Sequence, residues 1–169
     1  LVLVPFPPRY KFLAKAEPFK IPIFGRAAKA AGQIPIERDN RKAAFRSYEV
    51  AAERIRAGAS VVVFPEGTRG VAYELRPFKK GALVLGAAAG VPILPTILHG
   101  TLPIQPKGSF RIRSGQVDVH FLAPIETADC TYDDRDRLAR ECWDRMAIAL
   151  RELYGIESGP PSSRPLVEA

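Results

Sequence analysis

The segment VVVFPEGTRG occupies residues 61–70 and says more about the fold than any other part of the chain. It begins with a continuous apolar run over 61–64, which is typical of a strand buried on both faces in a parallel sheet. Pro65 stiffens the exit from this strand, and Gly67 frees the backbone to turn. Because ligands bind where loops leave the carboxyl ends of such strands, this loop is the first candidate for a functional site.

Strand and helix patterns alternate along the chain on either side of this segment. Apolar and β-branched runs predict further strands, which cover residues 9–16, 33–38 and 91–98. Helical spacing and terminal glycines predict helices, which cover residues 26–31, 41–57 and 79–90. This alternation predicts an α/β domain with a mixed, largely parallel sheet flanked by helices.

The C-terminal part of the chain has a different pattern. Two short strands over 110–113 and 116–121 flank Ser114-Gly115, which predicts a hairpin. A long amphipathic helix is predicted over 133–154, and its apolar stripe consists of Leu138, Cys142, Met146, Ala149, Leu150 and Leu153. We expect one domain over residues 1–155 and a disordered, Pro- and Ser-rich tail over 156–169.

The charge of the chain is unevenly distributed. The 169 residues carry 25 Lys and Arg against 18 Asp and Glu, a net charge of +7. Residues 1–125 hold 19 of the basic and 8 of the acidic side chains, whereas residues 126–157 hold 5 and 9. A basic body favours an anionic partner, although a merely solvated basic surface gives the same count. Nucleic acid is disfavoured, because the chain has no Lys/Arg block, no aromatic RNA-binding segment and no Cys/His finger.

Residues 81–98 contain no charged side chain, and eighteen residues reach the nominal length of a membrane span. Pro92 and Pro95 argue against a continuous helix, because proline costs roughly 3 kcal/mol in a helix interior. We therefore expect a helix that ends near Gly90, followed by a buried strand.

The side chains of the loop after residue 64 allow two interpretations. Thr68 offers a hydroxyl, and Glu66 and Arg69 place opposite charges close together, as a binding loop would. The same residues also suit an ordinary surface loop with an exposed ion pair. An apolar strand followed by an acidic residue is also typical of a Walker B element, but its GxxxxGK[ST] partner does not occur in this chain.

Residues 64–69 (FPEGTR) resemble a sequence block of the glycerolipid acyltransferases, in their lysophosphatidic acid acyltransferase (1-acyl-glycerol-3-phosphate acyltransferase) branch. Further segments resemble the other blocks of that family and occur in the family's order. They are residues 11–17 (KFLAKAE), 21–25 (IPIFG), 34–38 (IPIER), 78–81 (FKKG) and 91–95 (VPILP). The resemblance covers about residues 9–100, and it implies the glycerol-3-phosphate acyltransferase-like fold.

The resemblance implies transfer of an acyl group from acyl-CoA or acyl-carrier protein to the hydroxyl of 1-acyl-glycerol-3-phosphate, which makes phosphatidic acid. In the family, a His-x4-Asp block supplies the general base and the carboxylate that orients it. This chain departs from that pattern, because five residues beyond His99 and His120 stand Ile104 and Ile125. We expect the block to precede Leu1, the chain alone to be inactive, and both histidines to be structural.

The resemblance also assigns roles to residues that are present. Arg69 and Lys15 are the expected phosphate ligands, with Arg38 of the second block beside them. Glu66 is expected to hold the loop or the glycerol of the acceptor. Gly67 and Thr68 would add backbone and hydroxyl contacts, and Pro92 would shape the wall of an acyl pocket. Arg38 and Lys15 could instead be ordinary surface cations.

No cofactor or metal is expected, because no His, Cys and carboxylate cluster has ligand spacing. Acyl-CoA or acyl-carrier protein serves as co-substrate, and long acyl chains place the reaction at a bilayer. The apolar residues 1–8 and 19–24, interleaved with Lys and Arg, suit contact with anionic lipid, although they could also pack in the core. The protein is expected at the cytoplasmic face of the membrane, either peripheral or anchored by a segment that precedes residue 1.

Two alternatives to this function remain open. The protein could be a sister acyltransferase with another lysolipid or an aminolipid as acceptor, because the acceptor pocket cannot be identified in the sequence. It could also be a non-catalytic, lipid-binding relic that has lost its base. A His-x4-Asp block upstream would indicate an enzyme, and its absence a relic.

Overall fold

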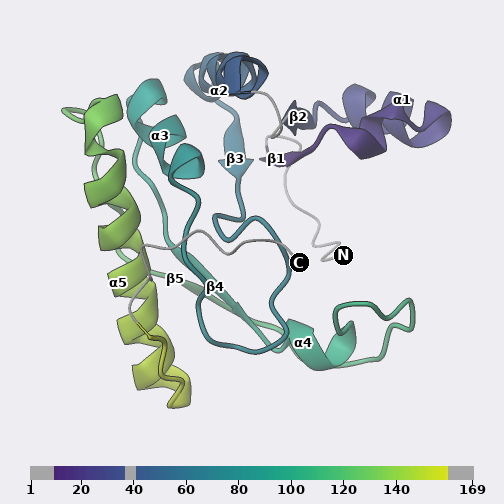
Figure 1. The fold of residues 1–169 in the computed structure, drawn as a ribbon, viewed down its shortest axis with the longest axis vertical. Coiled ribbons are helices and arrows are strands. Elements are labelled where there is room, and N and C mark those ends of the chain that lie inside the picture. Colours follow the sequence, from purple (N-terminus) through teal and green to yellow (C-terminus); the bar gives the residue numbers. More distant parts are fainter. Residues whose placement is uncertain (1–9, 37–40, 160–169) are drawn as a thin grey trace.

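The computed structural model describes residues 10–36 and 41–159, which form two sheets with helices around them (Figure 1). The first sheet is parallel and has the strand order β2-β1-β3. Its strands are β1 (Tyr10–Lys15), β2 (Ile34–Ile36) and β3 (Ser60–Val62). The second sheet pairs β4 (Thr96–His99) with β5 (Asp118–Phe121) in antiparallel fashion. The predicted α/β class with a largely parallel sheet flanked by helices is confirmed.

The helices follow the predicted order along the chain. They are η1 (Glu17–Lys20), α1 (Pro22–Ala30), α2 (Arg41–Arg56), α3 (Lys80–Ala89), α4 (Thr101–Ile104), η2 (Tyr132–Asp134) and α5 (Arg135–Tyr154). Gly90 and Gly155 adopt left-handed conformations (φ 66° for each) where α3 and α5 end, as the sequence predicts for C-terminal glycines. The long C-terminal helix is therefore confirmed, and residues 81–98 divide into a helix, a connection and a strand.

The valine-rich strand is not the buried centre of the sheet. The central strand is β1, and β3 pairs only with β1 among the described residues. Val61 and Val62 are half-buried, and Phe64 is exposed. The prediction of burial on both faces was wrong, because an apolar run reports side-chain composition, whereas burial also depends on the place of a strand within the sheet.

The predicted hairpin around Ser114-Gly115 is also wrong. Residues 110–113 form no strand, and β5 pairs instead with β4, with Thr96 opposite Phe121 and His99 opposite Asp118. The predicted strand over 91–98 begins only at Thr96, since Ile93 makes an isolated bridge to Ile125. Alternating apolar and basic residues over 110–113 have the period of a strand, but in the part of the chain that the structure describes they pair with no other strand, and the Arg113 N–H donates to the Ile104 carbonyl instead.

Two apolar clusters hold the layers together, and α3 contributes to both, since it packs between α2 and α5 (Figure 1). The first cluster joins the parallel sheet to α2 and α3, and consists of Leu13, Ile34, Ile36, Ala51, Ala52, Leu85 and Ala89. The second joins α3 to α5 and the chain after β5, and consists of Leu83, Ile125, Leu138, Ala139 and Cys142.

The predicted stripe of α5 is correct for most of its length. Leu138, Cys142 and Leu150 are buried, but Leu153 is 48% exposed. The buried line continues from Leu150 to Tyr154, four residues later, whose ring stacks on His99. Tyr154, rather than Leu153, therefore continues this face of the helix after Leu150, so the prediction was wrong at its last position.

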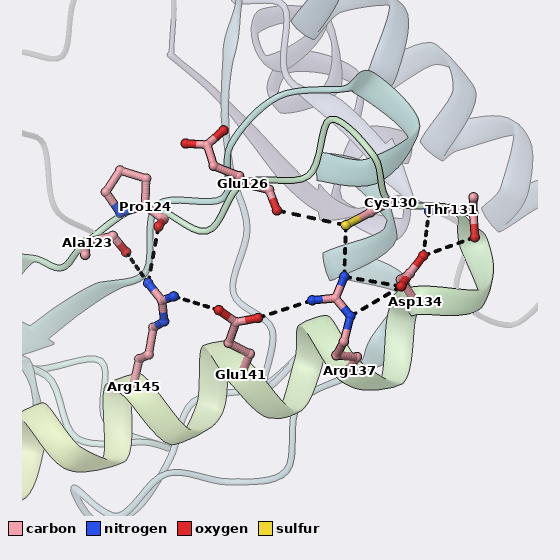
Figure 2. Close-up of polar contacts among 9 residues, drawn as sticks. All are labelled: Ala123, Pro124, Glu126, Cys130, Thr131, Asp134, Arg137, Glu141 and Arg145. Atoms are coloured by element: carbon pink, nitrogen blue, oxygen red, sulfur yellow. Dashed lines mark hydrogen bonds and ion pairs between the residues drawn. The ribbon is translucent and has the colours of Figure 1, made fainter.

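Charged side chains of α5 fasten the helix to the connection that follows β5 (Figure 2). The Arg145 guanidinium donates to the carbonyls of Ala123 and Pro124 (3.1 and 3.2 Å) and pairs with Glu141 (2.6 Å). Glu141 also pairs with Arg137 (3.4 Å), which contacts the sulfur of Cys130 and the carboxylate of Asp134. Part of the polar face of α5 is therefore engaged in tertiary contacts.

Candidate functional site

Lys15 and the loop that contains residues 66–69 lie at one edge of the parallel sheet. The three strands are parallel: β1 and β2 end opposite each other at Lys15 and Ile36, and β3 ends at Val62, opposite Phe12. Lys15 is the last residue of β1, and the loop 65–69 begins three residues after β3. The register therefore brings Lys15 and this loop to the same carboxyl edge. Arg38, which follows β2, lies outside the described residues.

Residues 65–79 form a long loop whose two ends are joined by a hydrogen bond. The Lys79 N–H donates to the Pro65 carbonyl at 2.7 Å, and the Gly67 N–H donates to the Phe64 carbonyl at 3.0 Å. Gly67 has a φ of 77°, and a Cβ atom there would lie 2.7 Å from Cε of Lys79. A glycine is thus required by both the backbone conformation and the neighbouring side chain. The loop is a compact Ω-like unit, a class that is often functional.

Glu66 points across this loop rather than into solvent. Its carboxylate is half-buried, accepts a hydrogen bond from the Arg76 backbone N–H and lies near the Arg76 guanidinium. Burial raises the pKa of Glu66, and the two interactions with Arg76 lower it by less. These contacts suit the predicted role of holding the loop.

Replacing Glu66 with glutamine is expected to change how stability depends on pH. The raised pKa means that the folded protein favours the protonated carboxyl, so this contribution is present below the unfolded pKa and is lost as pH rises through the folded pKa. We expect the free energy of unfolding of the unsubstituted chain, relative to Glu66→Gln, to fall as pH rises from below 4.5 towards neutrality. Urea unfolding at a series of pH values measures this difference.

The control for that experiment is Glu74→Gln, because Glu74 is an exposed carboxyl in the same loop. A difference between the unsubstituted chain and Glu66→Gln that grew with pH would show that Arg76, rather than burial, dominates at Glu66.

The two expected phosphate ligands are both exposed. Within the described residues, neither Arg69 nor Lys15 makes a hydrogen bond or ion pair through its side chain. The surface ion pair that an ordinary loop would form between Glu66 and Arg69 is absent from that part of the chain, since Glu66 faces Arg76. Both cations therefore remain available for an anion, and the neighbouring Thr68 is exposed as well.

Lys79 is a further cation at the loop that the sequence did not single out. Its side chain lies against Gly67, and its backbone closes the loop at Pro65. The signal was available, because Lys79 belongs to the FKKG block over 78–81. The next residue, Lys80, instead forms an ion pair with Asp136 of α5 at 2.8 Å. The structure thus distinguishes two adjacent lysines that look equivalent in the sequence.

Pro92 is not brought to this loop. It follows the far end of α3, and a helix of 10 residues spans about 15 Å. Pro92 is exposed and lies between Val91, whose carbonyl accepts from the Thr127 hydroxyl, and Ile93. Its role in an acyl pocket stays a prediction.

Both histidines lie in an aromatic cluster around Tyr154. The His99 ring stacks between Tyr154 and Tyr73, with ring centroids 3.7 and 4.5 Å apart. His120 Nε2 lies 2.6 Å from the Tyr154 hydroxyl, which also donates to Asp118 (3.3 Å). Hydrogen bonding from Gln116 lowers the pKa of Asp118, with a smaller contribution from Tyr154. Since Tyr73 belongs to the loop 65–79, the cluster connects that loop to β4 and α5.

Two further features of the described residues bear on the predictions. Within residues 10–36 and 41–159, no three His, Cys, Asp or Glu side chains are grouped so as to hold a metal ion. In the same residues, none of the helices has both the length and the apolar character needed to cross a bilayer.

Comparison with known proteins identifies the family. The acyltransferase family model matches residues 1–99. A chloroplastic 1-acyl-sn-glycerol-3-phosphate acyltransferase of Brassica napus is 40% identical over 134 residues, which is 77% of this chain and 39% of that protein. The enzyme of the same name from Limnanthes alba is 37% identical over 155 residues, covering 91% and 52%. The chain thus spans about half the length, or less, of these relatives.

A solved structure gives the same result. The 1-acyl-sn-glycerophosphate (LPA) acyltransferase PlsC of Thermotoga maritima matches with a TM-score of 0.65 at 25% sequence identity, over 89% of this chain and 59% of that one. The predicted resemblance, based on six short segments, is confirmed by whole-domain similarity in both sequence and structure. The chain therefore belongs to the acyltransferase family.

Proposed function

We propose that the protein containing residues 1–169 is a 1-acyl-sn-glycerol-3-phosphate acyltransferase, and that these residues supply its acceptor-phosphate site. The observation that carries the proposal is the loop 65–79 at the carboxyl edge of the sheet, in a chain of this family. Arg69 of this loop and Lys15 at the end of β1 lack carboxylate partners among the described residues. Relatives from plants and from Haemophilus influenzae, the latter 33% identical, carry the name of this activity.

The proposed chemistry is transfer of an acyl group from the sulfur of a thioester to the oxygen of the acceptor hydroxyl. The acceptor hydroxyl loses its proton to a general base, and its oxygen attacks the thioester carbonyl of acyl-CoA or acyl-carrier protein. The carbon–sulfur bond then breaks, and the thiol leaves with a proton as the new ester forms. Residues 1–169 contain no His-x4-Asp, so in this proposal the base comes from outside them.

The residues of this chain position the acceptor for that step. Arg69 offers a planar fork to the phosphate, and Lys15 offers a point charge from the neighbouring strand. Glu66 holds the loop through its contacts with Arg76, and in this way helps to position Arg69. Arg38 belongs to the same proposal on the strength of its sequence block alone. Holding the phosphate places the free hydroxyl of the glycerol for attack.

Peripheral contact with an anionic bilayer is also proposed, and α1 supports it. Ile21, Ile23 and Phe24 are exposed, Ile23 to 86%, so these residues do not pack in the core. The flanking Lys20 and Arg26 are exposed as well. An apolar face next to basic side chains suits the boundary between headgroups and acyl chains.

The proposed activity is tested with the complete protein that contains residues 1–169. Incubated with labelled acyl-CoA or acyl-carrier protein and 1-acyl-glycerol-3-phosphate, it is expected to form labelled phosphatidic acid. Glycerol-3-phosphate, lysophosphatidylcholine and an aminolipid acceptor serve as comparison substrates. Preference for one of these would indicate a sister acyltransferase, and lipid binding without any product would indicate a relic.

A further inference from the structure

The connection between α4 and β5 carries an exposed apolar tip. We call residues 105–115 the basic loop; in Figure 1 it extends away from the rest of the ribbon beyond α4. Phe110 is 99% exposed and Ile112 is 66% exposed. Burying such side chains is favourable, so full exposure of a phenylalanine is informative when its surroundings hold it there. The basic loop lies beyond residues 1–99, which the family model matches.

The shape of the basic loop is fixed by its own hydrogen bonds. At its base the Arg113 N–H donates to the Ile104 carbonyl at 2.9 Å, and Gly115 packs so closely on Ile104 that a Cβ there would lie 2.7 Å from Cγ1. Near its tip the Ser109 N–H donates to the Pro106 carbonyl at 3.1 Å, and the Arg111 N–H donates to the Ser109 hydroxyl at 3.1 Å. Phe110 is therefore presented by a closed turn with a defined backbone.

The charge around the tip has a single sign. Lys107, Arg111 and Arg113 are all exposed, and no Asp or Glu occurs from Thr101 to Val117. The two arginines alternate with Phe110 and Ile112 along the chain, so the exposed apolar side chains are flanked by positive charge. An anionic surface that also accepts apolar side chains would bind both the basic and the apolar residues of the loop.

We infer that the basic loop inserts Phe110 and Ile112 into the interface of an anionic bilayer, while its arginines and lysine contact lipid headgroups. A bilayer accepts single side chains from a narrow loop, whereas a stable protein interface needs on the order of 1,000 Å² of well-packed surface. The pairing of one aromatic with flanking cations is typical of membrane-surface contacts. This inference rests on the proposed function in one respect, because a lipid substrate requires the protein to reach a membrane surface.

The first test places a fluorophore at the tip of the basic loop in the whole chain. Trp143, the single tryptophan, is buried and provides a constant background. Phe110→Trp is expected to shift its emission to shorter wavelength when mixed phosphatidylcholine and phosphatidylglycerol vesicles are added, and less with phosphatidylcholine alone or at high salt. Phe121→Trp is the matched control, because Phe121 is 66% exposed on β5. An unshifted Phe110→Trp, or an equal shift in the control, would overturn the inference.

The second test removes the apolar tip. The double variant Phe110→Ser, Ile112→Ser is expected to weaken sedimentation with anionic vesicles by about tenfold or more, whereas Phe121→Ser leaves it unchanged. Binding of the double variant equal to that of the unsubstituted chain would refute bilayer insertion. A response of Phe110→Trp to acyl-carrier protein but not to vesicles would do the same and assign the basic loop to a protein. Neither readout needs acyl transfer, so their failure and that of the proposed function are distinguishable.

Discussion

Replacing Arg69 with alanine in the complete protein is expected to raise the apparent KM for 1-acyl-glycerol-3-phosphate by about tenfold or more. A charge-assisted hydrogen bond contributes roughly 1.5–3 kcal/mol, and 1.4 kcal/mol corresponds to a factor of ten. Arg69 is exposed and has no ion-pair partner among the described residues, so its charge is available to the phosphate. The rise in KM with little change in kcat would identify binding of the acceptor rather than the chemical step. Initial rates at varied acceptor concentration measure both.

Two matched variants make the result specific. Arg140→Ala removes an exposed arginine from α5, outside the loop 65–79, and is expected to leave KM unchanged. Arg69→Lys keeps the charge but loses the fork, so its KM should lie between those of the unsubstituted protein and Arg69→Ala. If Arg69→Ala left the KM of the acceptor unchanged, Arg69 would not be a phosphate ligand.

Leu138→Ala is expected to have the largest effect on stability, lowering the free energy of unfolding by about 2–5 kcal/mol. Leu138 is completely buried (0% exposed), in the cluster that joins α3 and α5. Truncation loses buried apolar area and leaves a cavity that two helices and the segment around Ile125 can fill only in part. Urea unfolding of the whole chain, monitored by circular dichroism, measures the change.

Leu153→Ala provides the matched comparison on the same helix. Its side chain is 48% exposed, so its truncation is expected to cost less than about 1 kcal/mol. Equal effects of the two substitutions would mean that α5 does not pack on α3 along the line from Leu138 to Leu150.

The fold class and most helix boundaries could be predicted because they depend on local signals. Glycine has to follow α3 and α5 where the backbone becomes left-handed, and helical periodicity extends over the whole of α5. Strand pairing is not local, so the sequence could not show that β5 pairs with β4 across 18 intervening residues, 100–117. For the same reason a run of valines did not reveal that β1, with fewer β-branched residues, is the central strand.

The candidate site could be predicted as a set of residue types but not as a set of contacts. The loop after residue 64 and the lysine at the end of β1 were identifiable, because a turn after a strand and a family block mark them. That Glu66 contacts Arg76 rather than Arg69 depends on how residues 70–79 fold back, which no spacing in the sequence encodes. The prediction of a strand over 110–113 failed for a similar reason, because the alternating apolar and basic residues there form the exposed tip of the basic loop.

The residues that follow α5, as far as residue 159, contact the loop 65–79. The Ile156 N–H donates to the Leu150 carbonyl, and the Leu75 N–H donates to the Ser158 hydroxyl at 2.9 Å across 83 positions. The contact with Ser158 therefore holds the loop 65–79 from beyond the family-matched residues 1–99, and the stacking of Tyr73 on His99 holds it from within them. Substitutions in the few residues that follow α5 are therefore expected to change the conformation of the loop 65–79 while every signature block stays unchanged.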